Sequence, residues 1–159
     1  MNNIKMKKVL ISLDYNPTAE KVAETGYALA KEMGAEVYLI HVISNMEYYT
    51  STVYSPIMGY GDFGNVGLST VYTAEDLKAE TQKYLNKSKD HLSDDTIQTI
   101  VVEGDSADAI LDVAADIHAD VIVMGSHSRR WLDKILVGSV TERVLHKSKI
   151  PLFIVPTRG

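Results

Sequence analysis

The chain of 159 residues has no cysteine and no long apolar run near its start. The missing cysteine excludes disulfides, thiolate zinc sites and a cysteine nucleophile, and it is compatible with a reducing compartment. Behind the lysines of MNNIKMKK, the polar residues Asp14 and Asn16 arrive too soon for a signal peptide or a membrane anchor. We therefore expect a cytoplasmic protein that does not act on membranes.

An excess of basic charge is also missing, and so are the common phosphate and metal motifs. The net charge of -5 gives no general reason to expect a nucleic-acid partner, because such a partner needs a basic face. There is no G-x-x-x-x-G-K-[ST] phosphate loop and no H-E-x-x-H zinc pair. Residues 59–64, GYGDFG, spell the pattern G-x-G-x-x-G. We expect no dinucleotide site there, because that motif must close a strand and open a helix.

What the chain does contain is a regular alternation of apolar runs and helical patterns. Five short apolar runs predict buried strands at 8–13, 36–43, 96–102, 121–124 and 152–155. Apolar residues at helical spacing predict helices at 16–34, 73–92, 106–117 and about 139–147. Strands that are apolar nearly throughout and alternate with helices predict a doubly wound α/β domain, with helices on both faces of a parallel sheet.

The helix ends carry recognisable signals. The expected N-caps of the first three helices are Asn16, Thr73 and Ser106, because their side chains can accept from free backbone N–H groups. Gly34 is expected to stop the first helix in a left-handed conformation.

Residues 45–72 interrupt the alternation with tyrosines, glycines and no helical period. Connections of this length are usually functional lids or disordered segments. We expect a flexible insert in a single domain of residues 1–159. A mobile flap over a site and a segment that docks a partner are the alternatives.

The stretch GSHSRRWLDKILVGS, residues 125–139, combines a basic loop with a glycine at each end. Gly125 follows the fourth strand, where a missing side chain lets a ligand lie against the backbone. Gly138 and Ser139 open the last helix, whose free N–H groups and partial positive charge receive anions. We expect a phosphate cradle here. Its candidate members are Gly125, Ser126, Ser128, Gly138, Ser139 and the Val140 amide, with Arg129, Arg130 and Lys134 as nearby cations.

A purely structural explanation of the same stretch stays open. Ser139-x-x-Glu142 also fits a capping box, in which the Ser139 hydroxyl closes only its own helix. His127 lies inside the loop and is a weaker candidate for contact with phosphate. His41 lies inside a predicted strand and is expected to be a satisfied core residue rather than a ligand.

Two long parts of the chain resemble the universal stress protein family. They read KVLISLDYNPTAEKVAETGYALAKEMGAEVYLIHVI and VVEGDSADAILDVAADIHADVIVMGSHSRRWLDKILVGSVTERVLHKSKIPLFIVP. The nucleotide-binding branch of that family has the signature G-x2-G-x9-G-[ST], and this chain has Gly125, Ser128, Gly138 and Ser139 at the four positions. Ser128 is the departure. If that position needs a positive φ, serine costs about 1–2 kcal/mol there, although its hydroxyl can donate to a phosphate.

The resemblance implies a fold, a ligand and an assembly. The fold is a five-stranded parallel sheet of order 3-2-1-4-5, similar to adenine-nucleotide alpha-hydrolases. The ligand is ATP, or AMP or ADP, with or without Mg or Mn, and no protein side chain is assigned to the metal. Asp14 is implied near the ribose and adenine, with Val42 and Met124 beside the adenine. A homodimer through the last strand, Leu152–Val155, is implied as well. The implied nucleotide-binding residues are Ser12, Leu13, Asp14, Val42, Met124, Gly125, Ser126, His127, Ser128, Arg129, Gly138, Ser139, Val140 and Thr141.

We therefore expect an ATP-binding stress-response module with at most slow hydrolysis, because the sequence offers no poised base or oriented nucleophile. Two alternatives stay open. One is an interaction module that binds no nucleotide and captures an unidentified protein partner through residues 45–72. The other is an enzyme, either an ATPase or a nucleotidyl-transferring protein. Such an enzyme is expected to carry a basic or histidine motif near the first strand, where this chain reads DYNPTAE.

Overall fold

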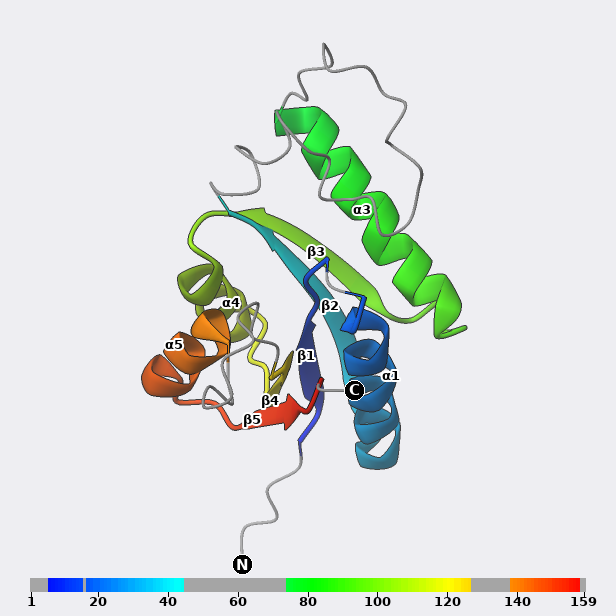
Figure 1. The fold of residues 1–159 in the computed structure, drawn as a ribbon. Coiled ribbons are helices and arrows are strands. Elements are labelled where there is room, and N and C mark those ends of the chain that lie inside the picture. The colour runs from blue at the N-terminus through cyan, green and yellow to red at the C-terminus, as the bar shows by residue number, and fades with distance from the viewer. Residues whose placement is uncertain (1–5, 16, 45–73, 127–137, 158–159) are drawn as a thin grey trace, which may run out of the picture.

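The computed structural model describes residues 6–15, 17–44, 74–126 and 138–157. These residues form five strands alternating with helices (Figure 1). Thr73, the loop 127–137 and the insert at 45–72 lie outside the described residues. In chain order the elements are β1 (Lys8–Ser12), α1 (Ala19–Met33), β2 (Glu36–Ile43), α3 (Ala74–His91), β3 (Gln98–Glu103), α4 (Ser106–Asp116), β4 (Val121–Gly125), α5 (Ser139–Lys147) and β5 (Leu152–Val155).

The five strands form one parallel sheet in the order β3-β2-β1-β4-β5, so the predicted fold is confirmed. β1 lies at the centre because it pairs with β2 on one side and with β4 on the other. The chain therefore winds outward from β1 to β3 in its first half and from β4 to β5 in its second. β3 and β5 form the two edges of the sheet.

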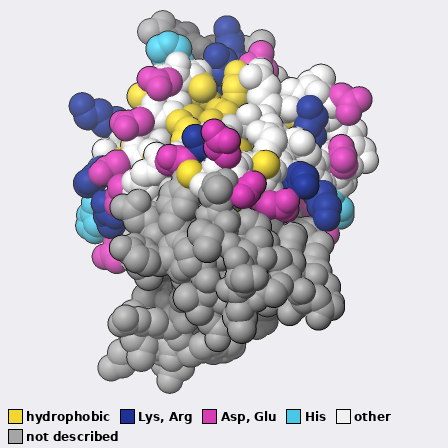
Figure 2. Space-filling model, turned by 90° about the horizontal axis from the view of Figure 1, so that it is seen from above, with side chains coloured by type: hydrophobic (Ala, Val, Ile, Leu, Met, Phe, Trp, Pro, Cys, Tyr) yellow, Lys and Arg dark blue, Asp and Glu magenta, His cyan; other side chains and the backbone are white. Residues whose placement is uncertain are grey.

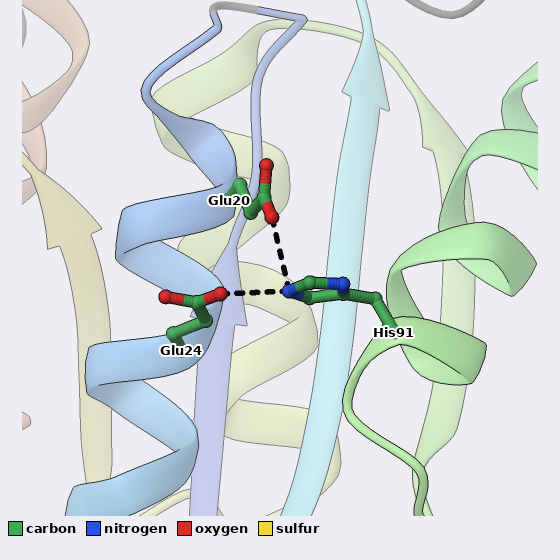
Figure 3. A group of neighbouring side chains, drawn as sticks. All are labelled: Glu20, Glu24 and His91. Carbon is green, nitrogen blue, oxygen red and sulfur yellow. Dashed lines mark hydrogen bonds and ion pairs between the residues drawn. The ribbon is translucent and has the colours of Figure 1, made fainter.

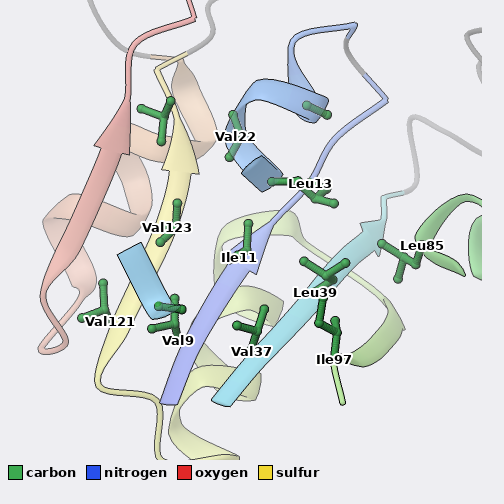
Figure 4. Packing of buried hydrophobic residues seen from close by; sticks show 14 of the residues in the cluster. Val9, Ile11, Leu13, Val22, Val37, Leu39, Leu85, Ile97, Val121 and Val123 are labelled. Carbon is green, nitrogen blue, oxygen red and sulfur yellow. The ribbon is translucent and has the colours of Figure 1, made fainter. Parts of the chain in front are cut away.

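Two helices cover each face of the sheet, because alternate residues of a strand point to opposite faces. In β1, Val9 and Ile11 pack in a cluster with residues of α1 and α3 (Figure 4), whereas Leu10 packs with residues of α4 and α5. All three are fully buried. This two-sided burial explains why the strands read as unbroken apolar runs.

α1 lies unusually close to the sheet at Gly26. A Cβ atom placed on Gly26 would lie 2.9 Å from Cδ1 of Ile11 and 3.0 Å from Cγ1 of Val123. A side chain at this position would therefore force Ile11, Val123 or α1 itself to shift. The glycine allows the helix to pack this close to the central strands.

The amino-terminal ends of β1 and β4 are joined by Asp120. Its carboxylate accepts hydrogen bonds from the amides of Lys7, at 2.7 Å, and of Lys8, at 2.9 Å. Its own amide donates to the carbonyl of Lys8 at 2.8 Å. These three bonds fasten the two central strands at the edge of the sheet where both begin.

The ends of α1 confirm one prediction and correct another. Gly34 ends the helix in the left-handed conformation, with φ of 64°, as predicted. The N-cap is Thr18 rather than Asn16, and the helix begins at Ala19. The Val22 amide donates to the Thr18 carbonyl at 3.2 Å, so Thr18 supplies an acceptor for the first turn of the helix.

α4 is capped by Asp105 and not by Ser106, which is already helical. The Asp105 carboxylate accepts from the Asp108 amide at 3.0 Å and receives two hydrogen bonds from the Arg143 guanidinium on α5. Arg143 lowers the pKa of the Asp105 carboxyl, and the Asp108 amide lowers it further. A carboxylate that meets both a helix N-terminus and a cation is a better cap than the neighbouring hydroxyl.

β3 begins two residues later than the predicted Thr96. The Asp94 carboxylate accepts from the Thr96 amide at 2.9 Å and from its hydroxyl at 2.6 Å, which folds this segment into a turn. The Tyr27 hydroxyl on α1 also donates to Asp94, at 2.8 Å. These bonds, those from Thr96 first, lower the pKa of Asp94 to about 2.

Candidate functional site

The candidate site lies where the carboxyl ends of β1 and β4 separate. These two strands are neighbours, but the chain leaves them in opposite directions, which is the arrangement that places ligands at the carboxyl edge of an open α/β sheet. Their pairing ends at Ile11 and Val123. The residues that follow, 12–14 on one side and 124–126 on the other, therefore extend past the paired part of the two strands.

The end of β1 is held by bonds to its backbone. The Leu13 amide donates to the Ile40 carbonyl at 2.9 Å, and the Leu13 carbonyl accepts from Nδ1 of His41 at 2.7 Å. The Asp14 carbonyl accepts from the Tyr84 hydroxyl at 2.5 Å. Leu13 is buried, Ser12 is half-buried and the Asp14 side chain is exposed. Asp14, which the sequence predicts as a site residue, therefore has an exposed side chain on a backbone that buried side chains hold in place.

His41 is a core residue, as predicted. Its side chain is 3% exposed, and its Nδ1 faces a carbonyl, so Nδ1 carries the ring proton that donates. The ring lies 4.3 Å from that of Tyr15, measured between centroids. His41 therefore supports the end of β1 and is part of the core under the site.

Val42 and Met124 belong to one apolar layer. Both are buried in the cluster that faces α4 and α5. The backbone of Ile40 faces β1, so by strand alternation the N–H and C=O groups of Val42 face the same side. Because β1 and β2 are paired only as far as Ser12 and Ile40, Val42 presents its backbone beyond that pairing.

The tail of β4 and the head of α5 meet. The Thr141 hydroxyl, in the first turn of α5, donates to the Gly125 carbonyl at the end of β4, at 2.9 Å. Thr141 is only 5% exposed. This bond brings together the two backbone segments on which the sequence places a phosphate cradle.

α5 is capped by Gly138, so Ser139 is the first helical residue and not the N-cap that the capping-box explanation requires. Gly138 is buried and extended, with φ of -66°, a conformation open to any residue. Backbone freedom therefore does not require a glycine at this position. Ser139 is exposed and Val140 half-buried, and the first-turn amides of a helix have no acceptor within it.

Ser126 closes β4 onto the end of β5. Its amide donates to the Val155 carbonyl at 2.9 Å, and its hydroxyl oxygen accepts from the Thr157 amide at 3.1 Å. These bonds hold Ser126 next to Gly125 of the predicted phosphate cradle. Its amide already donates to β5, which leaves its hydroxyl as the group that can also donate to a ligand. The other predicted loop residues, His127, Ser128 and Arg129, lie outside the described residues.

Viewed from above, the described surface mixes charges of both signs around a group of hydrophobic side chains (Figure 2). No single sign of charge dominates the part of this face that the structure describes. At the junction of β4 and α5, the first-turn amides of α5 and the helix dipole favour an anion.

A second group of polar side chains lies between α1 and α3 (Figure 3). Nε2 of His91 lies 2.7 Å from Glu24 and 3.0 Å from Glu20, and the ligand atoms of all three lie within 4.8 Å of one another. The hydrogen bond that His91 makes to Glu24 raises the pKa of His91, and the charge of Glu20 adds to this. When its ring is protonated, His91 forms an ion pair that links α3 to α1.

The chain matches the universal stress protein family over residues 5–156. This chain belongs to the universal stress protein family. The universal stress protein MJ0577 of Methanocaldococcus jannaschii is 31% identical over 99% of both chains. A solved structure of MJ0577 covers 98% of this chain and 99% of its own, with a TM-score of 0.72 and 28% identity.

Two more distant universal stress proteins share the fold at 18% identity. One was solved in complex with cAMP and has a TM-score of 0.64, with coverage of 98% of this chain and 100% of its own. The other, from Archaeoglobus fulgidus, was solved in complex with dAMP and has a TM-score of 0.60, with coverage of 95% and 98%. Among the described residues of this universal stress protein, no helix is both long enough and apolar enough to cross a bilayer.

Sequence reasoning missed the side chains that support Asp14 in this universal stress protein. Tyr84 lies on the predicted apolar stripe of α3 and is 2% exposed. The hydroxyl of a buried tyrosine needs a hydrogen-bond partner, and that need was the available signal. No pattern along the chain indicates that the partner is the backbone of Asp14, 70 residues away.

Proposed function

We propose that this protein binds an adenine nucleotide across the carboxyl ends of β1 and β4, with ATP as its principal ligand. The observation that carries the proposal is the bond from Thr141 to Gly125, because it makes the head of α5 and the tail of β4 one continuous backbone surface. The phosphates lie against the first-turn amides of α5, which the helix dipole makes favourable for anions. The cAMP and dAMP complexes of two fold relatives support an adenine nucleotide.

The adenosine end of the nucleotide lies toward β1 and β2. In this proposal the Asp14 carboxylate accepts from ribose hydroxyls, and the backbone of Val42 pairs with the polar edge of adenine. Met124 supplies apolar surface from the neighbouring strand. Loop residues 127–129 complete the phosphate side of the proposed site.

A divalent ion fits this site only as a companion of the nucleotide. Amide groups donate hydrogen bonds and suit phosphate oxygens, whereas Mg²⁺ or Mn²⁺ needs oxygen ligands. The ion would therefore be held by the phosphates, whose negative charge it offsets. The amides position the phosphates but do not activate water, so we propose at most slow hydrolysis and a role as a nucleotide-dependent regulatory module in the cytoplasm.

Co-purification and calorimetry test the proposal directly. Freshly purified protein is denatured, and its supernatant is separated by ion-exchange chromatography to detect adenine nucleotides. Calorimetric titration then measures the Kd of ATP with Mg²⁺ and of AMP. The absence of nucleotide in the first assay, together with no heat of binding in the second, would reject the proposal in favour of a module that binds no nucleotide.

A matched pair of substitutions locates the phosphates. Ser139 and Ser106 are the first helical residues of α5 and α4. A glutamate at either position suits the helix dipole, so Ser139→Glu and Ser106→Glu both preserve folding. Ser139→Glu places a negative charge where the phosphates lie and should abolish ATP binding, whereas Ser106→Glu should leave the Kd unchanged. Equal affinities in the two variants would place the phosphates elsewhere.

We also propose a homodimer that pairs through β5. β5 is an edge strand that can pair with a second copy, and the large apolar side chain of Phe153 on it is 37% exposed. Phe153→Glu should convert the dimer to a monomer, measured as the molar mass by light scattering after gel filtration. An unchanged mass would show that β5 is not the contact.

A further inference from the structure

A cluster of aromatic and polar side chains joins α3 to the end of β1. We call Tyr15, His41, Thr81 and Tyr84 the α3 anchor. The ring centroids of Tyr15 lie 4.3 Å from His41 and 4.9 Å from Tyr84, and those of His41 and Tyr84 are 6.2 Å apart. The anchor thus packs residues from the turn after β1, from β2 and from α3 into one compact group.

The hydrogen bonds of the anchor end on the backbone of the candidate site. Tyr84 donates to the carbonyl of Asp14, and His41 donates to the carbonyl of Leu13. The Tyr15 hydroxyl bonds the Thr81 hydroxyl, which also donates to the Leu77 carbonyl within α3. Two successive carbonyls are therefore fixed by side chains that are themselves fixed by packing.

Fixing these two carbonyls fixes the direction of Asp14. A peptide unit is planar, so holding the Leu13 carbonyl also orients the Asp14 N–H, and holding the Asp14 carbonyl orients the next N–H. The Cα atom of Asp14 lies between these two planes. The direction of its Cα–Cβ bond, which begins the exposed side chain, is therefore set by contacts beneath it.

We propose that Tyr84 and His41 are positioning residues of the nucleotide site, and that α3 is thereby coupled to nucleotide binding. This inference rests on the proposed function. The anchor holds Asp14 in the direction that meets the ribose, and it exists only while α3 is docked on the sheet. Undocking of α3 removes the Tyr84 bond and lets the end of β1 relax.

Thermodynamic linkage gives the coupling a size. A ligand shifts the docking equilibrium by at most the ratio of its Kd values for the undocked and docked forms. Loss of one hydrogen bond sets that ratio at about 3- to 10-fold, so bound nucleotide makes the opening of α3 rarer by that factor. α3 is therefore the element whose docking on the sheet depends on whether nucleotide is bound.

Tyr84→Phe tests the positioning role, with Tyr27→Phe as the matched control. Both substitutions remove one tyrosine hydroxyl that bonds another element, but the Tyr27 hydroxyl bonds Asp94, away from the site. Tyr84→Phe should raise the Kd of ATP and of AMP by the same factor, about 3- to 10-fold, as expected for one lost hydrogen bond. It should leave the Kd of tripolyphosphate unchanged, because that probe lacks a ribose. Tyr27→Phe should leave all three values unchanged.

The outcomes separate this inference from the proposed function. If the wild-type protein binds no ATP, the proposed function fails and the inference fails with it. If the wild type binds ATP but Tyr84→Phe binds it equally well, only the inference is overturned. It is also overturned if both variants weaken ATP alike, or if Tyr84→Phe weakens tripolyphosphate as much as ATP, because either result indicates a general loss of structure.

Hydrogen exchange tests the coupling independently of affinity. Exchange of the α3 amides is compared with and without ATP at 100 times its Kd, with the α4 amides as an internal reference. In the wild type, ATP should slow the α3 amides by about 3- to 10-fold beyond any slowing in α4. The effect should shrink in Tyr84→Phe. Equal slowing of α3 and α4 would overturn the coupling.

Discussion

The bond between Thr141 and Gly125 gives the sharpest single prediction, because it joins the two halves of the proposed phosphate site. Thr141→Val keeps the shape of the side chain but removes the hydroxyl that donates to Gly125 at 2.9 Å. The carbonyl of Gly125 then loses a donor in a half-buried position. Such a loss costs about 1–2 kcal/mol, because partial access of water reduces the penalty of a fully buried group.

This cost can be measured in two ways. For a chain of this size, each kcal/mol lowers Tm by about 2–4 °C, so Thr141→Val should melt about 2–8 °C below the wild type. If α5 also moves away from β4, the ATP Kd should rise by up to about tenfold, which corresponds to about 1.4 kcal/mol. Urea unfolding gives the stability change and calorimetry gives the Kd.

Two companion variants isolate the cause. Thr141→Ser retains the hydroxyl and should recover the ATP Kd of the wild type. Thr99→Val removes a hydroxyl that accepts from Gln82 at 2.7 Å near the far edge of the sheet, and it should lower stability without changing the Kd. The reasoning is refuted if Thr141→Val matches the wild type in both Tm and Kd, or if Thr141→Ser fails to recover binding.

Three further predictions concern the packing, the helix bridge and the signature loop. Gly26→Ala should lower the free energy of unfolding measured in urea by about 1 kcal/mol, because crowding against Ile11 costs about 1–3 kcal/mol and outweighs about 1 kcal/mol of helix propensity. His91→Gln should lower the urea midpoint below about pH 6.5, with the difference vanishing as pH rises through the raised pKa of His91, and a pH-independent difference would contradict the bridge. Ser128→Gly should lower the calorimetric Kd of ATP, and Gly138→Val should abolish ATP binding by blocking the approach of a phosphate.

The strands and their order were predictable because burial on both faces leaves a plain sequence signal. β2 and β5 have the predicted limits, and β1 and β4 differ from theirs by one residue at the carboxyl end. The extension of β4 has a simple reason. Gly125 pairs with Val155, so β5 extends the strand into a residue that the sequence assigns to a loop.

The helix starts were harder to predict, because neighbouring residues compete for the same role. Asp105 and Ser106 can both cap a helix, and Arg143, which lies 38 residues away, favours the carboxylate. Gly138 precedes Ser139 in the same way at the start of α5. Local preference thus marks a helix start to within a residue or two, and tertiary contacts decide between the candidates.

The sequence indicated which backbone segments form the candidate site, but it did not indicate which buried side chains hold those segments in place. Three of its predicted residues lie at the ends of strands or helices, which are Gly125, Gly138 and Asp14. Glycines and polar residues that follow an apolar run mark such ends in a sequence. Tyr84 and His41 lie inside elements with apolar patterns, and their polar atoms act on residues far away in the chain. Side-chain bonds to distant backbone groups follow from packing in three dimensions, which the spacing of residues along one chain does not encode.

The bonds of Asp120 have a consequence for how this protein tolerates change. They join the central strands at the end remote from the candidate site, so substitutions at the carboxyl end leave this connection intact. The proposed ligand preference can then change through substitutions near residues 125–138 while the two central strands stay joined where they begin.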